Sequence, residues 1–379
     1  MNQMTICHFI SYFLPVTQNW IYNQLVFNKK CRTVVLCQRR ENTGQFPFPQ
    51  VHPICRKKNL LSVPARAIHK LFEQYPLQPH LTVVNKNKPD ILHAHFLLEA
   101  WRNYRLIKKL RIPLVTTTYG QDISSLWRKP FWMSRYRKIF DTGKAFMVEG
   151  DHMKQILSGL GCPSEKITVV KLGVDLSVIP QKAYEKTQKP VKILFTGLNR
   201  EKKGAEFAAR AFVKSIRAGA DLELHLMGNG HYRRQVEQIF KQAGLENKAF
   251  FHGIIPVSRY LDLLSRTDIV LAPSVHARDG DSEGGAPVVV IEALAAGIPV
   301  VGSRHCDIPN IVEHGTSGLL SDEKDVETLA RNLYKLSSDP DLREKMGRKG
   351  MEYARAEHDI NTQVGKISAV YQQVLNIPK

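Results

Sequence analysis

Two glutamates flank the start of one predicted helix. Glu283 precedes the helix and Glu292 lies inside it, while Pro287 falls where the first residue of a helix belongs. Gly297 comes just past the helix end, the usual place for a glycine. The amides of residues 284–286 would then lie at the positive helix end, where free N–H groups attract oxygen-rich ligands. Two carboxylates beside such N–H groups suit a ligand covered in hydroxyl groups, so this segment predicts a sugar site.

A basic turn between a predicted strand and a predicted helix has the residue types of a phosphate site. Arg200, Lys202 and Lys203 follow the strand expected at residues 191–196, and Gly204 leads into the helix. A lysine acts there as a point charge, and an arginine can bind in a fork. The turn therefore suits a diphosphate, although a solvated basic turn explains the sequence equally well. It is not a Walker loop, because the pattern G-x-x-x-x-G-K-[ST] is absent.

Two other motifs in this half are weaker. Gly228 and Gly230 resemble a truncated G-x-G-x-x-G without its third glycine or its acidic residue, so they predict a tight turn beside the phosphate region. Asp279 and Asp281 resemble the carboxylate pairs that hold Mg²⁺ or Mn²⁺. They belong to the loop that leads to Glu283, and basic residues elsewhere can neutralise a diphosphate. We therefore favour a loop role for this pair and predict no metal.

In the first half, polar residues follow the ends of two predicted strands. H93-A-H95 ends one strand and T116-T-T-Y-G-Q-D122 ends the next. Because ligand-binding residues in parallel sheets come from strand ends, His95, Tyr119 and Asp122 are candidates for holding the reacting sugar or the acceptor. One histidine of the pair is expected to be structural. The loop at residues 14–24 follows the first strand and is a further candidate.

Short apolar strands alternate with amphipathic helices along the whole chain, which predicts an α/β fold with parallel sheets. The polar, proline-bounded stretch at residues 179–190 reads as a linker. We therefore predict two Rossmann-like, doubly wound domains facing a cleft, over residues 1–186 and 187–359, with a last helix at 360–379 that packs back onto the first domain. The strands are expected at residues 5–10, 33–37, 91–94, 114–117, 145–148, 167–170, 191–196, 222–227, 249–251, 269–272, 299–302 and 318–320.

Composition supports a packed protein of more than one domain. The chain has 379 residues, of which 43% are hydrophobic. Its six cysteines form no C-x-x-C pair and several lie in apolar surroundings, as expected of reduced, buried thiols in the cytosol. No apolar run reaches the ~18 residues of a membrane span. The N-terminal segment lacks a basic lead-in and a cleavage site, so we expect a strand there rather than a signal peptide.

Positive charge is concentrated in the first half of the chain. The net charge is +19, and residues 1–187 hold 28 Lys and Arg against 11 Asp and Glu. Such a half predicts an anionic partner, either nucleic acid or an anionic membrane face. Basic residues at 128–129 and 135–138 alternate with Trp127, Phe131, Trp132 and Tyr136, which is typical of a surface that rests on lipid headgroups. A solvated charged face explains any single basic cluster, such as residues 56–58, equally well.

Taken together, these segments resemble the retaining glycosyltransferases of family 4, which have the two-domain GT-B fold. The resemblance covers essentially the whole chain. Its most specific piece is residues 273–301, followed by D307-I-P-N-I-V-E-H-G-T-S-G-L-L320, and H93-A-H-F96 and T117-T-Y-G-Q-D122 are similar to the family's H-A-H-F and T-x-H-G-x-D segments. The most similar subgroup makes bacterial exopolysaccharide, colanic-acid-type or lipopolysaccharide chains.

The resemblance implies a role for each matching residue. The first glutamate of the family's E-x7-E motif lies by the transferred sugar and the second binds the ribose, and these match Glu283 and Glu292. The lysine that binds the diphosphate matches Lys203, and Arg200 is the nearest arginine. The catalytic set is then Glu283, Lys203 and Arg200. The remaining donor-binding residues are Gly284, Gly285, Ala286 and Pro287.

Three positions depart from the family pattern. Eight residues rather than seven separate Glu283 from Glu292, so the loop carries one additional residue. The family's phosphate-binding arginine aligns with Leu198, and Arg200 replaces it only if the loop allows. The family's histidine before G-x-D is Tyr119 here, which can hydrogen-bond a sugar hydroxyl but is not a cation at neutral pH.

The resemblance implies transfer of a hexose from a UDP- or GDP-sugar, with retention of anomeric configuration and without a metal or other cofactor. The implied acceptor is a glycan, on a polyprenyl diphosphate at the inner face of the cytoplasmic membrane, which the basic half would contact as a peripheral protein. Nucleic acid is not expected as a partner.

The sequence is also compatible with four alternatives. They are an inverting GT-B transferase, a sugar epimerase, a catalytically altered scaffold protein of a polysaccharide complex, and a basic nucleic-acid-binding module. The last leaves residues 283–302 unexplained.

Overall fold

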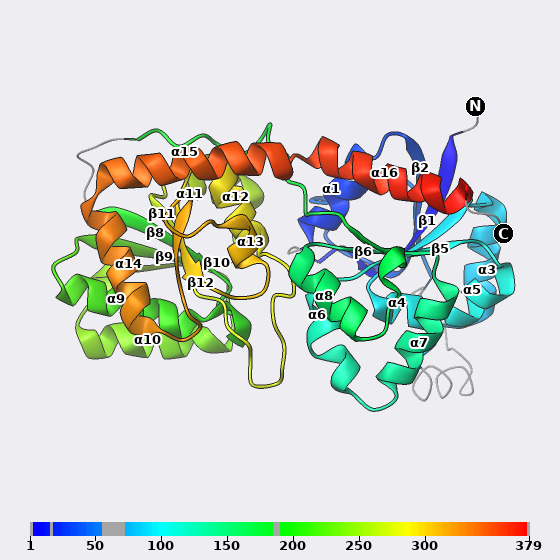
Figure 1. The fold of residues 1–379 in the computed structure, drawn as a ribbon, viewed down its shortest axis with the longest axis horizontal. Helices are drawn as coiled ribbons and strands as arrows, with labels where there is room; N and C mark the ends of the chain where they lie inside the picture. Colours follow the sequence, from blue (N-terminus) through cyan, green and yellow to red (C-terminus); the bar gives the residue numbers. More distant parts are fainter. Residues whose placement is uncertain (1–2, 16–17, 55–72, 185–189, 377–379) are drawn as a thin grey trace. The chain divides into compact units, whose positions relative to one another are not determined.

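The computed structural model describes residues 3–15, 18–54, 73–184 and 190–376. They form two compact units, each built on one parallel sheet with helices on both faces (Figure 1). We call Met1–Gly173 with Ile360–Lys379 the N-terminal unit, and Val174–Asp359 the C-terminal unit. The predicted doubly wound α/β class is therefore confirmed. The basic cluster at residues 56–58 and residues 185–189 of the expected linker lie outside the described ranges.

The N-terminal unit contains a seven-stranded sheet in the order β3-β2-β1-β4-β5-β6-β7. Its strands are β1 (Met4–Phe13), β2 (Cys31–Arg40), β3 (Val51–Pro53), β4 (Ile91–His95), β5 (Leu114–Thr117), β6 (Ala145–Val148) and β7 (Ile167–Val169). Its helices are α1 (Asn19–Phe27), α3 (Leu77–Asn87), α4 (Leu97–Arg102), α5 (Tyr104–Leu110), α6 (Gly120–Ser124), α7 (Trp132–Thr142), α8 (Asp151–Gly159) and α16 (Ile360–Asn376). The edge strand β3 was not predicted, because its three residues are too short to show a pattern.

Alternation along the strands sends apolar side chains to both faces of this sheet. In β1, Cys7 and Phe9 join the core beneath α4, α5, α7 and α8, whereas Ile6 joins a second core against α16. Successive side chains of a strand point to opposite faces, so a strand covered on both sides is apolar throughout. One polar residue, His8, interrupts this run and lies on the same face of the sheet as Ile6.

The C-terminal unit contains a six-stranded sheet in the order β10-β9-β8-β11-β12-β13. Its strands are β8 (Val191–Thr196), β9 (Leu222–Met227), β10 (Ala249–Gly253), β11 (Ile269–Ala272), β12 (Val300–Ser303) and β13 (Gly318–Ser321). Its helices are α9 (Ala205–Arg217), α10 (His231–Ala243), α11 (Val257–Ser265), α12 (Val288–Ala296), α13 (Ile308–Ile311), α14 (Val326–Ser338) and α15 (Pro340–Glu357). The strand order reverses direction at β8, between β9 and β11, and such a reversal is where ligands bind in doubly wound sheets.

The unit boundaries differ from the expected domain boundary. Residues 174–184, expected in the first domain, group with the C-terminal unit. The amide of Val174 donates to the carbonyl of His358 at 2.8 Å, and Lys182 forms an ion pair with Asp268 at 2.8 Å. The Tyr184 hydroxyl donates to the carbonyl of Gly297 at 2.7 Å. The connecting chain is therefore bonded along the C-terminal unit before β8 begins.

The last helix, α16, belongs to the N-terminal unit. Ile367, Val370, Tyr371 and Val374 pack against the apolar residues of β1, β4, β5 and β6. The Tyr371 hydroxyl lies 2.7 Å from Nδ1 of His93, and Ser368 donates to the side chain of Asn28 at 3.1 Å. These contacts close one face of the first sheet.

Two further properties follow from the described residues. None of their helices combines the length and apolar character needed to cross a membrane. The five described cysteines are free thiols, and four of them are buried while Cys306 is half-buried. Burial raises the pKa of the Cys7 and Cys162 thiols to about 12, so both stay protonated at neutral pH.

Candidate active site

Two loops meet at the point where the second sheet reverses its strand order. The loop after β8 contains a short 3-10 helix, Glu201–Lys203, and Gly204 follows it with a φ of +71°. A Cβ atom at Gly204 would lie 1.9 Å from the carbonyl oxygen of Pro273, which follows β11, so only glycine permits this approach. The amide of Val275 donates to the carbonyl of Lys202 at 2.8 Å. The basic turn and the acidic loop are thereby joined.

At this junction Lys203 and Glu283 form an ion pair. The Lys203 ammonium lies 2.9 Å from one carboxylate oxygen of Glu283 and 3.0 Å from the other. Ser274 donates its hydroxyl to the same carboxylate at 3.0 Å. Burial opposes ionisation of Glu283, but Lys203 and Lys202 outweigh it and hold its pKa below the usual value. Glu283 is therefore an anion at neutral pH, which suits a hydrogen-bond acceptor and not an acid.

The neighbouring carboxylates, Asp279 and Asp281, have partners in the same loop and in the basic turn. Lys202 lies 3.2 Å from the Asp281 carboxylate and donates to the carbonyl of Ser282 at 2.8 Å. The Asp279 carboxylate accepts from the amide of Asp281 at 2.9 Å. These contacts agree with a loop role for Asp279 and Asp281.

The loop after β12 supports Glu283 from its backbone. The amide of Glu283 donates to Nε2 of His305 at 3.1 Å. Nδ1 of His305 lies 2.7 Å from the Glu323 carboxylate, and Nδ1 of His276 lies 2.8 Å from the same oxygen. Donor atoms of His276, His305 and Cys306 all lie within 4.8 Å of one another, as in a metal site. Both nitrogens of His305 take part in these hydrogen bonds, so we interpret the group as a hydrogen-bonded support of the loop.

Helix α12 begins directly behind this loop. Val288 is its first residue and Pro287 is its N-cap, so the helix starts one residue later than the sequence predicted. Gly297 ends the helix with a φ of +83°, as its position predicted. Gly284 also has a positive φ, +78°, and lies with Gly285 and Ala286 between Glu283 and the helix start. The small residues thus lie at the helix N-terminus as expected.

Glu292 is buried inside α12. The hydroxyl of Tyr260, from α11, donates to its carboxylate. Burial raises the pKa of Glu292 to about 7, although the Tyr260 hydrogen bond acts in the opposite direction. The two glutamates therefore differ in charge near neutral pH: Glu283 is held as an anion by lysine, whereas Glu292 is poised between its two forms.

The other residues of the basic turn take different positions. Leu198, at the position of the family arginine, is fully buried in the core of the C-terminal unit. Arg200 is exposed on the loop. A Cβ atom at Gly230 would lie 2.5 Å from Cα of Asn199, so the turn after β9 packs against the basic turn. This agrees with a tight turn beside the phosphate region.

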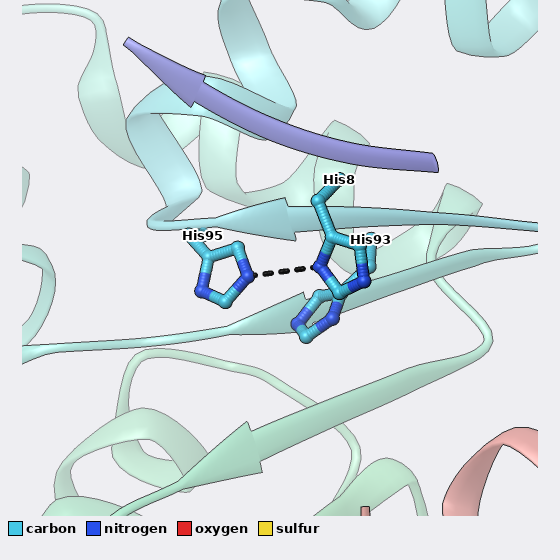
Figure 2. Close-up of side chains that lie close together, drawn as sticks. All are labelled: His8, His93 and His95. Atoms are coloured by element: carbon cyan, nitrogen blue, oxygen red, sulfur yellow. Dashed lines mark hydrogen bonds between the residues drawn. The ribbon is translucent and has the colours of Figure 1, made fainter. Parts of the chain in front are cut away.

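In the N-terminal unit the predicted residues form an internal network. His8 of β1 and His93 of β4 are paired side by side in adjacent strands, and His95 lies at the end of β4 (Figure 2). Nδ1 of His8 lies 3.1 Å from Nε2 of His95, whose Nδ1 lies 2.9 Å from the Tyr119 hydroxyl. Burial lowers the pKa of all three rings, so they are neutral at neutral pH.

His93 and Asp122 have structural partners. The ring of His93 bridges Tyr371 at 2.7 Å and Thr117 at 2.8 Å, so this histidine links β4 to α16 and to β5. The carboxylate of Asp122 accepts from the amide of Tyr119 at 3.1 Å in a capping box of α6. His95, Tyr119 and Asp122 are all buried, so an acceptor role for them stays a prediction.

Several residues of these networks were not predicted. Tyr260, Ser274, His305 and Glu323 surround the two glutamates, and His8 joins the histidines. His8 had a signal, because it is a polar residue inside an apolar strand. The other four had none, because each reaches its partner through a different loop or helix of the fold.

The raised pKa of Glu292 predicts a pH-dependent effect of Glu292→Gln. An acid with a folded pKa of about 7 keeps its proton where the unfolded chain, near 4.5, has lost it. Native stability therefore falls as pH rises through this window. We expect Glu292→Gln to be more stable than wild type by roughly 1–3 kcal/mol at pH 8.5 and equal to it near pH 5.

Urea unfolding at both pH values measures this difference. Glu246→Gln, at an exposed glutamate, is the matched control and should leave stability unchanged at either pH. A Glu292→Gln variant with the same stability offset at both pH values would contradict the buried, protonatable carboxylate.

Comparison with known proteins gives the family. The model Glycosyltransferase Family 4 matches residues 28–178, and the model Glycosyl transferases group 1 matches residues 180–353. The protein named colanic acid biosynthesis glycosyltransferase WcaL in Escherichia coli is 32% identical over 280 residues, covering 73% of this chain and 68% of that protein. The amylovoran biosynthesis glycosyltransferase AmsK of Erwinia amylovora is 34% identical over 269 residues, covering 69% and 65%. The matches thus span about two thirds of these relatives.

The fold has solved counterparts. The crystal structure of HepE from Anabaena, in complex with UDP and glucose, matches 98% of this chain and 100% of that chain with a TM-score of 0.78 at 16% identity. Two parallel-sheet Rossmann-like domains in succession are the GT-B architecture. The chain belongs to the group 1 and family 4 glycosyltransferases and has their GT-B fold.

Proposed function

We propose that this protein transfers a hexose from a UDP- or GDP-sugar to a glycan acceptor, with retention of anomeric configuration, in the synthesis of a cell-surface polysaccharide. The observation that carries the proposal is the Lys203–Glu283 pair at the strand-order reversal of the C-terminal unit. A cation beside an anion suits a ligand that carries both a diphosphate and sugar hydroxyls, which supports the proposal. HepE, which shares the fold, has been solved with UDP and with UDP-glucose.

Each donor group has a matching part of this site. Lys203, aided by the exposed Arg200, takes the diphosphate, and the amides at the start of α12 lie beside it. When the diphosphate draws the Lys203 ammonium away, the Glu283 carboxylate is left to accept hydrogen bonds from the sugar. Glu292, held by Tyr260, accepts from the ribose. These assignments follow the chemistry of the residues and their family counterparts.

Charge stabilisation is the proposed basis of catalysis. Because Glu283 is an anion in the protein without donor, we assign it the role of a hydrogen-bond acceptor and not that of a proton donor to the leaving group. We propose a front-face displacement in which the diphosphate leaves against Lys203 and Arg200, whose preorganised charges stabilise it. No metal is proposed for this step, since the Asp281 carboxylate is paired with Lys202.

A screen of nucleotides and their sugars tests the donor site. We expect UDP or GDP, and the corresponding sugar, to raise the thermal unfolding temperature of wild type in the presence of EDTA. Lys203→Ala should weaken this shift and lower kcat/KM by roughly ten- to hundredfold, because a lost charged hydrogen bond costs about 1.5–3 kcal/mol. Lys241→Ala, on the exposed side of α10, is the matched control.

The outcomes separate three readings. Wild-type turnover in Lys203→Ala would refute the diphosphate assignment. No response of wild type to any nucleotide would refute the proposed function. Donor binding without transfer or hydrolysis would identify a scaffold protein instead.

The stereochemistry is a separate prediction. Donors of the UDP-hexose type carry an α-linked sugar, and a retaining enzyme passes on that configuration. We expect the first product formed from an α-configured donor to show an α-anomeric proton by NMR, followed during the reaction. A β-configured product would show that the enzyme inverts.

The acceptor and the membrane form the second part of the proposal. WcaL and AmsK carry names of exopolysaccharide biosynthesis, and we propose a glycan acceptor linked to polyprenyl diphosphate for this chain. His95, Tyr119 and Asp122 are the proposed acceptor-side residues of the N-terminal unit. The proposed location is cytoplasmic, at the inner face of the cytoplasmic membrane.

One surface of the N-terminal unit suits a lipid interface. Trp132 and Tyr136, which the sequence grouped with this surface, are instead buried in the core of the unit, whereas Phe131, between η1 (Leu126–Arg128) and α7, is 78% exposed. Arg128 stacks on Trp127 with its guanidinium carbon 4.6 Å from the ring centroid, and Lys129 adds a further positive charge. An exposed aromatic ring among basic residues is suited to insertion between anionic headgroups.

Removal of this ring should weaken membrane binding. We expect Phe131→Ser to bind vesicles of anionic phospholipid about tenfold more weakly in co-sedimentation at low salt, because burial of a large aromatic ring contributes about 1.5–3 kcal/mol. Val257→Ser, at an exposed apolar residue of the C-terminal unit, is the control. A wild-type protein that ignores such vesicles would refute the membrane proposal.

A further inference from the structure

The segment that carries Glu283 is held at its backbone by a loop from elsewhere in the sheet. The loop after β12 contributes His305, whose Nε2 accepts the Glu283 amide at 3.1 Å. The adjacent Cys306 has hydrogen-bond partners in the side chain of Ser282 and the backbone of Gly284. Three consecutive residues, 282–284, are thus fixed from the β12 loop, at the point where the segment departs from the family by one residue.

The acceptor role of His305 requires one tautomer. Nε2 accepts a hydrogen bond only without its own hydrogen, so Nδ1 must carry the ring proton. Nδ1 lies 2.7 Å from the Glu323 carboxylate, which accepts that proton. Glu323 is itself oriented by His276, which donates through its backbone amide at 2.9 Å and approaches with Nδ1 at 2.8 Å. The carboxylate therefore selects the tautomer that Glu283 needs.

The protonation state of His305 agrees with this role. The ring is buried, and burial lowers its pKa even though Glu323 acts to raise it. A neutral ring keeps Nε2 available as an acceptor at neutral pH. A doubly protonated ring would instead point an N–H group at the Glu283 amide.

The two ends of Glu283 are held by different loops. Its carboxylate is bound by Lys203 from the β8 loop and by Ser274 from the β11 loop. Its backbone is bound by His305 from the β12 loop. When donor diphosphate competes for Lys203, the backbone contact is the one that continues to define where the carboxylate lies.

We propose that His305, in the tautomer fixed by Glu323, is a positioning residue that directs the Glu283 carboxylate toward the transferred sugar. The inference rests on the proposed function, because it assigns Glu283 to the sugar part of the donor. It deepens that function by naming the residue that compensates for the longer loop. His305 acts through Glu283 and does not itself contact the donor.

A pair of substitutions separates positioning from general support. In His305→Gln the side-chain carbonyl oxygen can occupy the place of Nε2 and accept the Glu283 amide. His305→Asn is shorter and can replace only Nδ1, so it keeps a donor for Glu323 and loses the acceptor for Glu283. Both variants remove the ring, so a difference between them reports on the contact with Glu283. His231→Gln, at an exposed histidine of α10, is the matched control.

The measurements use the full chain and the donor that stabilises wild type in the nucleotide screen. We expect His305→Asn to lower kcat for donor hydrolysis or transfer by about tenfold or more, with its affinity for the free nucleoside diphosphate within about twofold of wild type. His305→Gln should recover most of the lost kcat. This pattern is specific to positioning, because the free diphosphate lacks the sugar that Glu283 contacts.

Other outcomes overturn the inference. Wild-type kcat in His305→Asn would show that the contact does not direct Glu283. Equal loss in both variants, together with weaker diphosphate binding or lower thermal stability, would show that His305 only supports the fold. If the wild-type protein binds no nucleotide, the proposed function itself is refuted, and this outcome is distinguishable from a failure of the inference about His305.

Discussion

The ion pair between Lys203 and Glu283 is the interaction on which the rest of the site depends. Lys203 lies in the loop after β8 and Glu283 in the loop after β11. The two residues are 80 positions apart in the chain, but the two strands are neighbours in the sheet. A carboxylate as buried as Glu283, whose side chain is 7% exposed, is costly without a partner. The lysine therefore keeps a charged oxygen acceptor available where the strand order reverses. Gly204 makes the pairing possible by letting the two loops touch.

The two glutamates, Glu283 and Glu292, have the same side chain, but their surroundings shift their pKa values in opposite directions. Glu283 is surrounded by lysine, serine and a backbone contact, so it stays anionic. Glu292 is buried against a tyrosine hydroxyl, and its pKa rises to about 7. An anionic acceptor together with a neutral or weakly charged one, at the two ends of one loop and helix segment, suits a ligand that presents both a diphosphate and hydroxyl groups. In the N-terminal unit, in contrast, His8, His95, Tyr119 and Asp122 are bonded in sequence to one another, and His93 is bonded to Tyr371 of α16.

Much of the fold was predictable because it repeats a local pattern. Apolar runs such as residues 114–117 and 269–272 became strands with the predicted ends, since a parallel strand buried on both faces has little freedom in its sequence. Proline and glycine marked the two ends of α12 to within one residue. Two pieces without a sequence pattern were not predicted: the three-residue β3, and the contacts of the connecting chain at 174–184 with Asp268, Gly297 and His358.

The sequence by itself determined the class of fold, the family, and the residue types at the candidate site, because strand and helix periodicity and the motif around Glu283 are properties of neighbouring residues. It did not determine which side chains hold those residues. Only the tertiary structure brought His305 to the backbone of Glu283, Tyr260 to Glu292, and His8 to His95. Each of these contacts joins separate strands, loops or helices through a side chain. The pKa values of the side chains involved follow from burial and from neighbouring charges, which exist only after the sheets have formed.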